Sequence, residues 1–172
     1  MGVPMNGPDP AGSGDPPDAA AGFARFGLCG SRIAMQPDTS LPLQLAASVP
    51  TPLRATDSPT FIKIDMSVQN LSGSAVQVLT AKYGARMAIT KDGIVVAGPC
   101  GMRPVGSRYT IEPGATHAYT STVNLVSCDS DSGLAPGHYQ LHALQRFTFL
   151  DKELNTGQTI LVYGGPWDLE IR

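Results

Sequence analysis

The sequence has little charge and no long apolar run, and these shortages exclude several classes of protein. Charged residues make up 15% of the 172 residues, the net charge is −2, and no basic stripe runs along the chain. A nucleic-acid-binding surface is therefore not expected. No apolar run reaches the length of a membrane-spanning helix, and the N-terminus lacks the basic and then apolar pattern of a signal peptide. We expect no membrane span within this chain.

Motifs for catalysis, phosphate binding and metal binding are also missing. The sequence contains no Gly-x-Ser-x-Gly, no Gly-x-x-x-x-Gly-Lys and no Cys-x-x-Cys pattern. His138 and His142 are four residues apart, but on a strand that spacing is roughly 13 Å, too far for both to hold one ion. The segment 129–133 resembles the start of a calcium loop, but its Gly comes one place early and the twelfth position is Gln140. We expect a protein that is not an enzyme and needs no cofactor or metal, although a calcium site between loops stays open.

The three cysteines leave a choice of pairings. Cys100 and Cys128 are both flanked by turn residues, and we predict a disulfide between them. Closing that loop would stabilise the fold by about 3–4 kcal/mol in the chain-entropy model, and it would imply an oxidising, extracytoplasmic compartment. The alternative is two buried thiols. Cys29 is then left over as a free thiol or an intermolecular partner.

Residues 1–40 are predicted to form a flexible segment rich in proline and glycine. Nine of the first twenty residues are Gly or Pro, and residues 1–24 contain three Asp but no Lys or Arg. Such a composition buries too little apolar surface to offset its ordering entropy. It fits a disordered linker, or an arm that orders on a partner. Within 23–40, four apolar residues are able to pack on the following domain: Phe23, Phe26, Leu28 and Ile33. We find no convincing amphipathic helix anywhere in the chain.

From Leu41 onward the apolar residues recur with a period of two, which is typical of half-buried strands. The sequence Asp92-Gly93 lies between two such runs and predicts a tight hairpin, because Asp-Gly readily adopts positive φ angles. Gly164-Gly165-Pro166 interrupts the last run and predicts a bulge or a switch between sheets. The expected strands cover 41–46, 62–70, 75–80, 86–89, 94–97, 109–111, 117–125, 138–144, and 160–163 with 167–171 on either side of the break.

Two Pro-Gly turns introduce strands in the last third of the chain. Ile111-Glu112-Pro113-Gly114 and Leu134-Ala135-Pro136-Gly137 each precede a run rich in β-branched or aromatic residues. Proline presets φ and glycine tolerates positive φ, so each pair makes a tight turn before a strand. About eight or nine short strands with regular turns predict an all-β fold, an antiparallel sandwich over residues 41–172.

The order of these signals resembles that of bacterial immunoglobulin-like domains. The matching features are the strand 62–70, Val76-Gln77-Val78, the Asp92-Gly93 hairpin and the two Pro-Gly turns. The sequence looks most similar to the intracellular proteinase inhibitor type, known as BsuPI-like domains. This resemblance covers residues 41–172, and it implies an immunoglobulin-like sandwich with a binding or inhibitory role. The segment 134–139 also resembles the turn-plus-tyrosine signature of fibronectin type III domains, which implies that the Tyr139 hydroxyl bonds back to the backbone at a corner.

These observations predict a non-enzymatic binding or interaction module that works outside the cytoplasm and has a protein partner. Arg103 and Arg108 lie in the long loop 98–108, where they could contact an anion or a partner carboxylate, or simply act as solubilising charges. The loop 127–133 and the N-terminal arm are the other places where we expect function. Two alternative functions stay open. One is a proteinase-inhibitor-like domain, and the other is a structural component of a virion or envelope complex tethered by its N-terminal arm.

Overall fold

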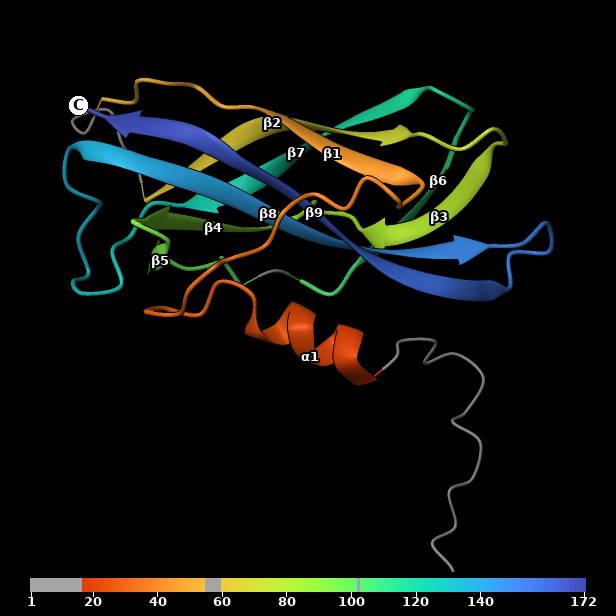
Figure 1. Cartoon of the computed structure of the whole chain (residues 1–172), viewed down its shortest axis with the longest axis horizontal. Coiled ribbons are helices and arrows are strands. Elements are labelled where there is room, and N and C mark those ends of the chain that lie inside the picture. Colours follow the sequence, from red (N-terminus) through yellow and green to blue (C-terminus); the bar gives the residue numbers. More distant parts are fainter. Residues whose placement is uncertain (1–16, 55–59, 102) are drawn as a thin grey trace, which may run out of the picture.

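The computed structural model describes residues 17–54, 60–101 and 103–172, and shows one short helix and nine strands in this part of the chain (Figure 1). The predicted disordered tail falls largely on residues 1–16, outside the described residues. The elements in chain order are α1 (Pro17–Arg25), β1 (Leu43–Ser48), β2 (Phe61–Asn70), β3 (Val76–Ala81), β4 (Arg86–Lys91), β5 (Ile94–Ala97), β6 (Gly106–Ile111), β7 (Thr116–Asn124), β8 (Gly137–Leu150) and β9 (Thr156–Ile171).

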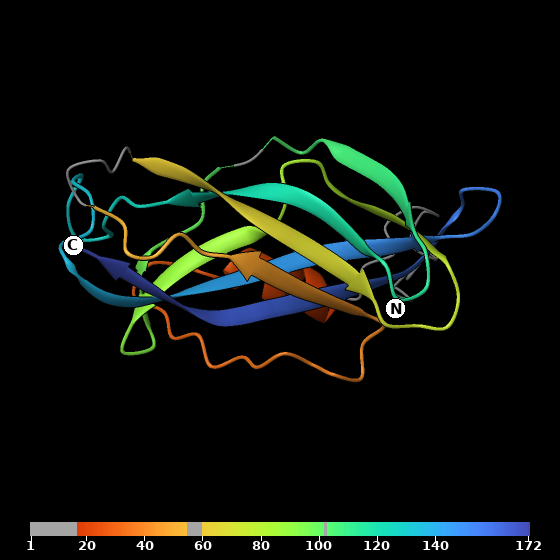
Figure 2. The same cartoon turned by 90° about the horizontal axis from the view of Figure 1, so that it is seen from above.

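The strands form two antiparallel sheets packed face to face, as the sequence predicts. The smaller sheet has the order β1-β2-β7. The larger sheet has the order β5-β4-β8-β3-β6, with β9 on the other edge of β8. The long strand β8 lies at the centre of the larger sheet and pairs with three strands. Strand β9 pairs along one edge of β8, and β4 and β3 pair with successive parts of its other edge. Figures 1 and 2 show the two layers from perpendicular directions.

The hydrophobic core lies between the two sheets and follows the alternation in the sequence. On β2, Ile64, Met66 and Val68 are at most 3% exposed, whereas the residues between them face solvent more. Phe147 on β8 is completely buried in the same cluster. Burial of one such side chain stabilises a fold by about 2–3 kcal/mol. Because the apolar residues alternate along the strands, they are buried together when two sheets pack face to face, and the period-two pattern therefore favours a sandwich.

Two turn predictions are confirmed in detail. Asp92 and Gly93 have φ angles of 52° and 80°, the positive values of a tight hairpin turn between β4 and β5. On β9, Trp167 is opposite Leu141 while Gly164 is opposite Ala143, so β9 carries one extra residue, which is a bulge. A Cβ at Gly164 would lie 2.7 Å from the Trp167 ring, which explains why this bulge requires glycine.

The corner role expected of Tyr139 is present in the structure. Its hydroxyl donates a 2.6 Å hydrogen bond to the carbonyl oxygen of Ala135, four residues earlier, and its ring is 7% exposed. The bond closes the second Pro-Gly turn at the start of β8.

A helix is present where the sequence suggested none. The nine-residue helix α1 is too short, and too rich in alanine, for a clear apolar stripe to stand out in the sequence. It ends just before Gly27, whose φ of 77° suits the left-handed residue that commonly follows a helix. Tertiary contacts hold it in place: Phe26 is 5% exposed and packs with Leu144 and Tyr163.

The segment 26–33 continues from α1 and pairs with the edge of β5. The amide of Gly30 donates to the carbonyl oxygen of Val95 at 3.0 Å, and the amide of Val95 donates back to Ser31 at 2.8 Å. We call residues 17–33 the N-terminal strap. Of the apolar residues expected to pack here, Phe23, Phe26 and Ile33 do so, but Leu28 is 52% exposed. The strap is therefore part of the folded domain, although it lies within the segment 1–40 that was expected to be flexible.

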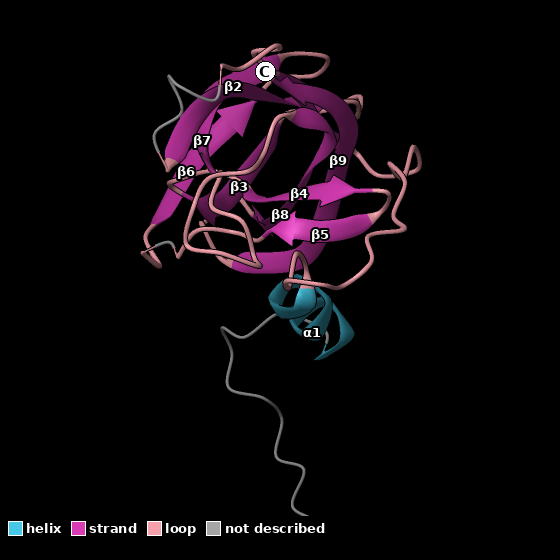
Figure 3. Ribbon diagram, turned by 90° about the vertical axis from the view of Figure 1, so that its left-hand side faces the viewer, coloured by secondary structure: helices cyan, strands magenta, loops and turns pink. Residues whose placement is uncertain are grey.

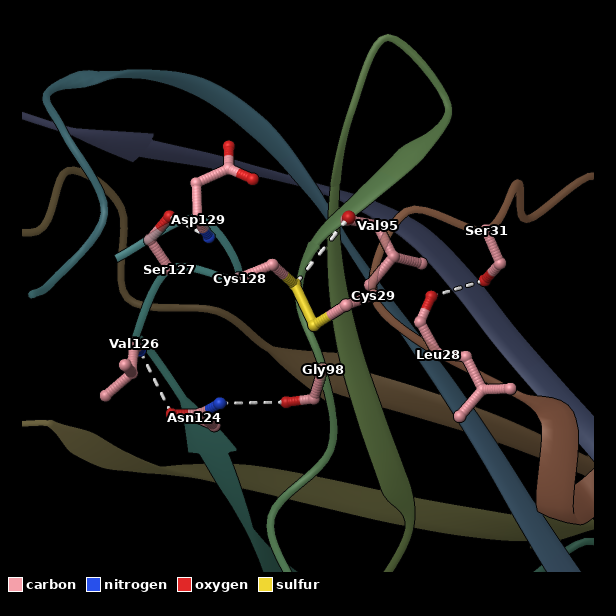
Figure 4. Close-up of a disulfide and its surroundings, with 10 residues drawn as sticks. All are labelled: Leu28, Cys29, Ser31, Val95, Gly98, Asn124, Val126, Ser127, Cys128 and Asp129. Carbon is pink, nitrogen blue, oxygen red and sulfur yellow. Dashed lines mark hydrogen bonds between the residues drawn. A yellow bond between two sulfur atoms is a disulfide. The ribbon is translucent and has the colours of Figure 1, made fainter. Parts of the chain in front are cut away.

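The disulfide joins Cys29 to Cys128, so the predicted Cys100–Cys128 pairing is wrong (Figure 4). Both partners are fixed to neighbouring residues of β5, which explains the pairing. The strap places Cys29 beside Val95, while the amide of Cys128 donates to the carbonyl oxygen of Val96 at 2.8 Å. Cys100 is a free, half-buried thiol. The bridge spans 99 residues of sequence, a separation at which the chain-entropy model gives about 4–5 kcal/mol of stabilisation.

Candidate functional site

A hollow formed by described residues lies on the outer face of the larger sheet. It has a volume of about 530 Å³, within the range of ligand-binding pockets. Phe23 of the helix α1 forms part of the wall, strands β3 and β8 form the floor, and residues 100–101 and 103–105 of the loop after β5 form another part of the wall. Figure 3 shows α1 lying outside the strands, next to the larger sheet. The lining residues are Phe23, Leu79, Thr80, Ala81, Gly84, Arg86, Cys100, Gly101, Arg103, Pro104, Val105, Gly106, Gln145, Arg146 and Thr148.

The floor of the pocket is held by a polar network that reaches through the sandwich. The hydroxyl of Thr80 donates to the carbonyl oxygen of Arg146 at 2.7 Å, and the side-chain amide of Gln145 donates to that hydroxyl at 2.9 Å. Tyr119, on the opposite sheet, donates to Oε1 of Gln145 at 2.5 Å. Burial raises the pKa of Tyr119 far above its usual value, so its hydroxyl keeps the proton that it donates. The floor is thereby tied to both sheets.

Three arginines line the pocket, and its described lining contains no Asp or Glu. Arg86 is fixed by α1: its Nε donates to the carbonyl oxygen of Phe26 at 3.3 Å, and Nη2 donates to that of Ala24 at 3.5 Å. These are carbonyls at the C-terminal end of the helix, where a cation is favourable. Burial lowers the pKa of Arg86 from its usual value, but a guanidinium stays charged.

The ring of Phe23 packs between two of these cations. Its centroid lies 5.6 Å from the Arg86 guanidinium carbon and 5.5 Å from that of Arg146. Both distances are within the range of cation–π attraction. The strap therefore contributes an aromatic wall, and it holds two positive groups at the pocket.

The two arginines singled out from the sequence lie on this same side of the molecule. Arg103 lines the pocket, and its side chain is exposed. Arg108 was expected in the loop 98–108, but this expectation is wrong, because the residue lies on β6, where it is exposed and stands opposite Leu79 on the pocket floor. We call this surface the arginine face, and it carries Arg86, Arg103, Arg108 and Arg146. The contact role expected of Arg103 and Arg108 stays a prediction.

Sequence reasoning missed the other members of the site. The alternation of β8 could have placed Arg146 on the outer face, because the neighbouring Phe147 is apolar and points inward. No local signal could have placed Phe23 or Arg86 there, since their meeting depends on how the strap folds back. Cys100 also lines the pocket, and burial raises the pKa of its thiol, so it is a poor nucleophile.

Two other histidines and the loop 127–133 make contacts within the fold. His142 is buried between two hydroxyls, with Thr90 at 2.8 Å from Nε2 and Tyr163 at 2.7 Å from Nδ1. His117 stacks on the ring of Tyr109 with centroids 3.7 Å apart. The segment 127–133 closes on itself through a hydrogen bond of 2.9 Å between the amide of Ser127 and the carbonyl of Ser132.

Among the described residues, no group of three or more His, Cys, Asp and Glu side chains could hold a metal ion. In the same part of the chain, no helix has the length and hydropathy needed to cross a membrane.

Comparison with known proteins shows little similarity. No protein-family model matches the sequence, and no curated protein matches it. Among solved structures, the chain is similar to a β-glucosidase from Listeria innocua. The complex with glucose gives a TM-score of 0.33 at 12% identity, and the complex with gluconolactone gives 0.36 at 11%. Each match covers 75% of this chain but only 16% of the β-glucosidase chain. Similarity this low carries no conclusion about function.

Proposed function

We propose that this chain is a non-enzymatic binding module that works outside the cytoplasm and holds an acidic surface of a protein partner against its arginine face. The observation that carries the proposal is the pocket lined by three arginines with no carboxylate in its described lining. The disulfide between Cys29 and Cys128 supports an oxidising compartment.

The clustering is unusual for a chain of this charge. The net charge is −2, yet arginines from β4, β6, β8 and the loop 98–105 gather on one side of one sheet. Arg86 and Arg103 share this hollow, and two like charges in a setting of low dielectric constant repel one another, so an anionic ligand between them relieves the repulsion. A positive patch also steers an acidic partner during association and fixes its orientation.

Arginine suits this task better than lysine would. Its planar guanidinium presents parallel N–H groups that match the two oxygens of a carboxylate. The exposed Arg103 and Arg108 are available at the rim, while Arg86 is already fixed by the helix carbonyls. A fixed cation loses little further freedom when a ligand binds, so the site is partly organised in advance.

The proposal can be tested by site-specific photo-cross-linking in the cells that produce the protein. A photoreactive amino acid at Val105, on the wall of the pocket, is compared with one at Lys63, which is exposed on the outer face of the other sheet. We expect one partner protein to cross-link from Val105 but not from Lys63. This adduct should disappear when Arg103→Glu and Arg108→Glu are combined.

Equal cross-linking from both positions, or an adduct that survives the double charge reversal, would refute binding through the arginine face. The identity of the partner also bears on the alternatives from the sequence. A protease recovered from Val105 would indicate an inhibitor-like role, and copies of an envelope or capsid protein would indicate a structural role.

A further inference from the structure

We infer that the pocket anchors a glutamate side chain of a partner segment, with an apolar neighbour of that glutamate packed on Leu79 and Val105. This inference rests on the proposed function, since it names the ligand chemistry of the same site.

Of the three guanidinium groups that line the pocket, that of Arg103 is exposed and that of Arg86 is fixed at the wall. Arg103 is exposed on the loop, and its side chain forms no hydrogen bond or ion pair with any described residue. Arg86 is held by two carbonyl oxygens at the end of α1. A carboxylate that enters between the helix and the loop meets both, and each charged hydrogen bond is about twice as strong as a neutral one.

The apolar residues that line the pocket favour a ligand whose carboxylate is attached to methylene groups over an inorganic anion. Phe23, Leu79 and Val105 line the same hollow as the arginines, and Val105 is 41% exposed. Phosphate or another small anion would leave these side chains in water. The methylene groups of glutamate and an aliphatic neighbour would cover these side chains and remove their apolar surface from water.

The position of β6 favours an extended polypeptide as the source of the carboxylate. In the described part of the larger sheet, β6 lies at the end of the strand order and pairs with β3 alone. The pocket reaches Gly106 at the start of β6, and Arg108 lies two residues further along the strand. A chain that leaves the pocket along this edge therefore passes a second exposed cation, which a second acidic residue can meet. Main-chain pairing with an open sheet edge is a common mode of peptide recognition.

The test uses the purified whole chain with its disulfide intact and a fluorescent peptide in which glutamate alternates with leucine. A second peptide has glutamine in place of every glutamate. Fluorescence anisotropy measures the two dissociation constants. We expect the glutamate peptide to bind at least about tenfold more tightly than the glutamine peptide, and its binding to weaken as salt is added.

Three variants locate the binding. Arg103→Glu should weaken the glutamate peptide about tenfold or more, because it replaces attraction by repulsion at an exposed position that the fold does not need. Lys63→Glu makes the same change of charge on the other sheet, and it should change the constant by less than about twofold. Val105→Ser should weaken the glutamate–leucine peptide, but not a peptide that alternates glutamate with serine. Thermal unfolding of each variant confirms that the fold is retained.

Several outcomes would overturn the inference. These are equal binding of the glutamine peptide, an equal loss in Lys63→Glu, or displacement of the peptide by inorganic phosphate at constant ionic strength. If the glutamate peptide does not bind but the cellular adduct at Val105 still requires Arg103 and Arg108, the inference fails and the proposed function stands. If the adduct is missing as well, both fail.

Discussion

At the scale of single residues, a few polar side chains hold the sandwich through bonds to hydroxyl or carbonyl groups. Tyr139 bonds to the Ala135 carbonyl, and His142 lies between Thr90 and Tyr163. A buried polar atom that loses such a partner costs more than the bond contributes, since the atom left behind keeps its desolvation penalty. Substitution of these residues should therefore change the free energy of unfolding by a measurable amount.

The first prediction concerns the corner tyrosine. Tyr139→Phe removes only the hydroxyl and should lower the free energy of unfolding by about 1 kcal/mol, because Ala135 is exposed and water can solvate its carbonyl. Urea denaturation measures the change. Tyr83→Phe is the matched control, since Tyr83 is 42% exposed, and it should cost less than about 0.5 kcal/mol. Equal effects of the two substitutions would contradict the corner role.

The second prediction concerns acid stability. Burial lowers the pKa of His142 from 6.5 to about 4, so the unfolded chain takes up a proton before the folded one does. Stability should therefore fall as the pH drops from about 6.5 towards 4, by on the order of 3 kcal/mol from this group. The contribution of His142 to the stability of the fold is greatest above pH 6.5, where its imidazole is neutral in both the folded and the unfolded state.

The check is denaturation at a series of pH values for the wild type and for His142→Gln. The variant should show a flatter dependence on pH between 4 and 6.5, whatever its absolute stability. His138→Gln changes an exposed histidine on the same strand and should keep the wild-type slope. If His142→Gln also keeps that slope, the buried histidine is not the responsible group.

At the scale of elements, the N-terminal strap packs on the larger sheet of the sandwich and contributes to the wall of the pocket. It is attached in three ways: by the buried ring of Phe26, by backbone pairing with β5 and by the disulfide from Cys29. Its ring of Phe23 then forms the pocket wall between Arg86 and Arg146. The strap thus couples the stability of the fold to the shape of the arginine face.

The third prediction tests this attachment. Cys29→Ser and Cys128→Ser should each lower the free energy of unfolding by several kcal/mol, up to the roughly 4–5 kcal/mol of the chain-entropy model. Cys100→Ser is the control and should have little effect, because Cys100 is a free thiol. Denaturation under oxidising conditions measures all three. A large loss in Cys100→Ser together with little loss in Cys29→Ser would show that Cys100, and not Cys29, forms the bridge.

At the scale of the whole molecule, the two sheets are joined by more than apolar packing. The network from Thr80 through Gln145 to Tyr119 crosses the core from β3 and β8 to β7, and Gln145 is 1% exposed. Because it starts at the pocket floor, it connects the arginine face to the opposite sheet. A buried network of this kind specifies how the two sheets align.

The fourth prediction removes one member of this network. Tyr119→Phe leaves Oε1 of the buried Gln145 without its donor and should cost about 1–3 kcal/mol. Tyr109→Phe is the control, because the described contact of Tyr109 is the stacking of its ring on His117, which phenylalanine keeps. That variant should lose less than about 0.5 kcal/mol in urea denaturation. A cost for Tyr119→Phe no greater than the control's would show that the network does not join the sheets.

The sequence by itself determined the positions of the strands, the turns and the corner, although β8 and β9 are longer than the ranges expected for them. The period of two follows from strand geometry, so the buried residues of β2 could be recognised without knowing the neighbouring strands. The turns were predictable because local φ preferences determine them, at Asp92-Gly93 and at Gly164-Gly165-Pro166. The hydroxyl of Tyr139 bonds to a residue only four positions away. Each of these features is fixed within a few residues of chain.

Only the tertiary structure decided the disulfide and the pocket. Cys29 meets Cys128 because two distant segments are hydrogen-bonded to adjacent residues of β5, whereas the spacing along the chain favoured the nearer Cys100. Phe23 meets Arg86 and Arg146 because the strap folds back over β8. Such meetings depend on the summed packing of many distant residues, and no local pattern of the sequence encodes them.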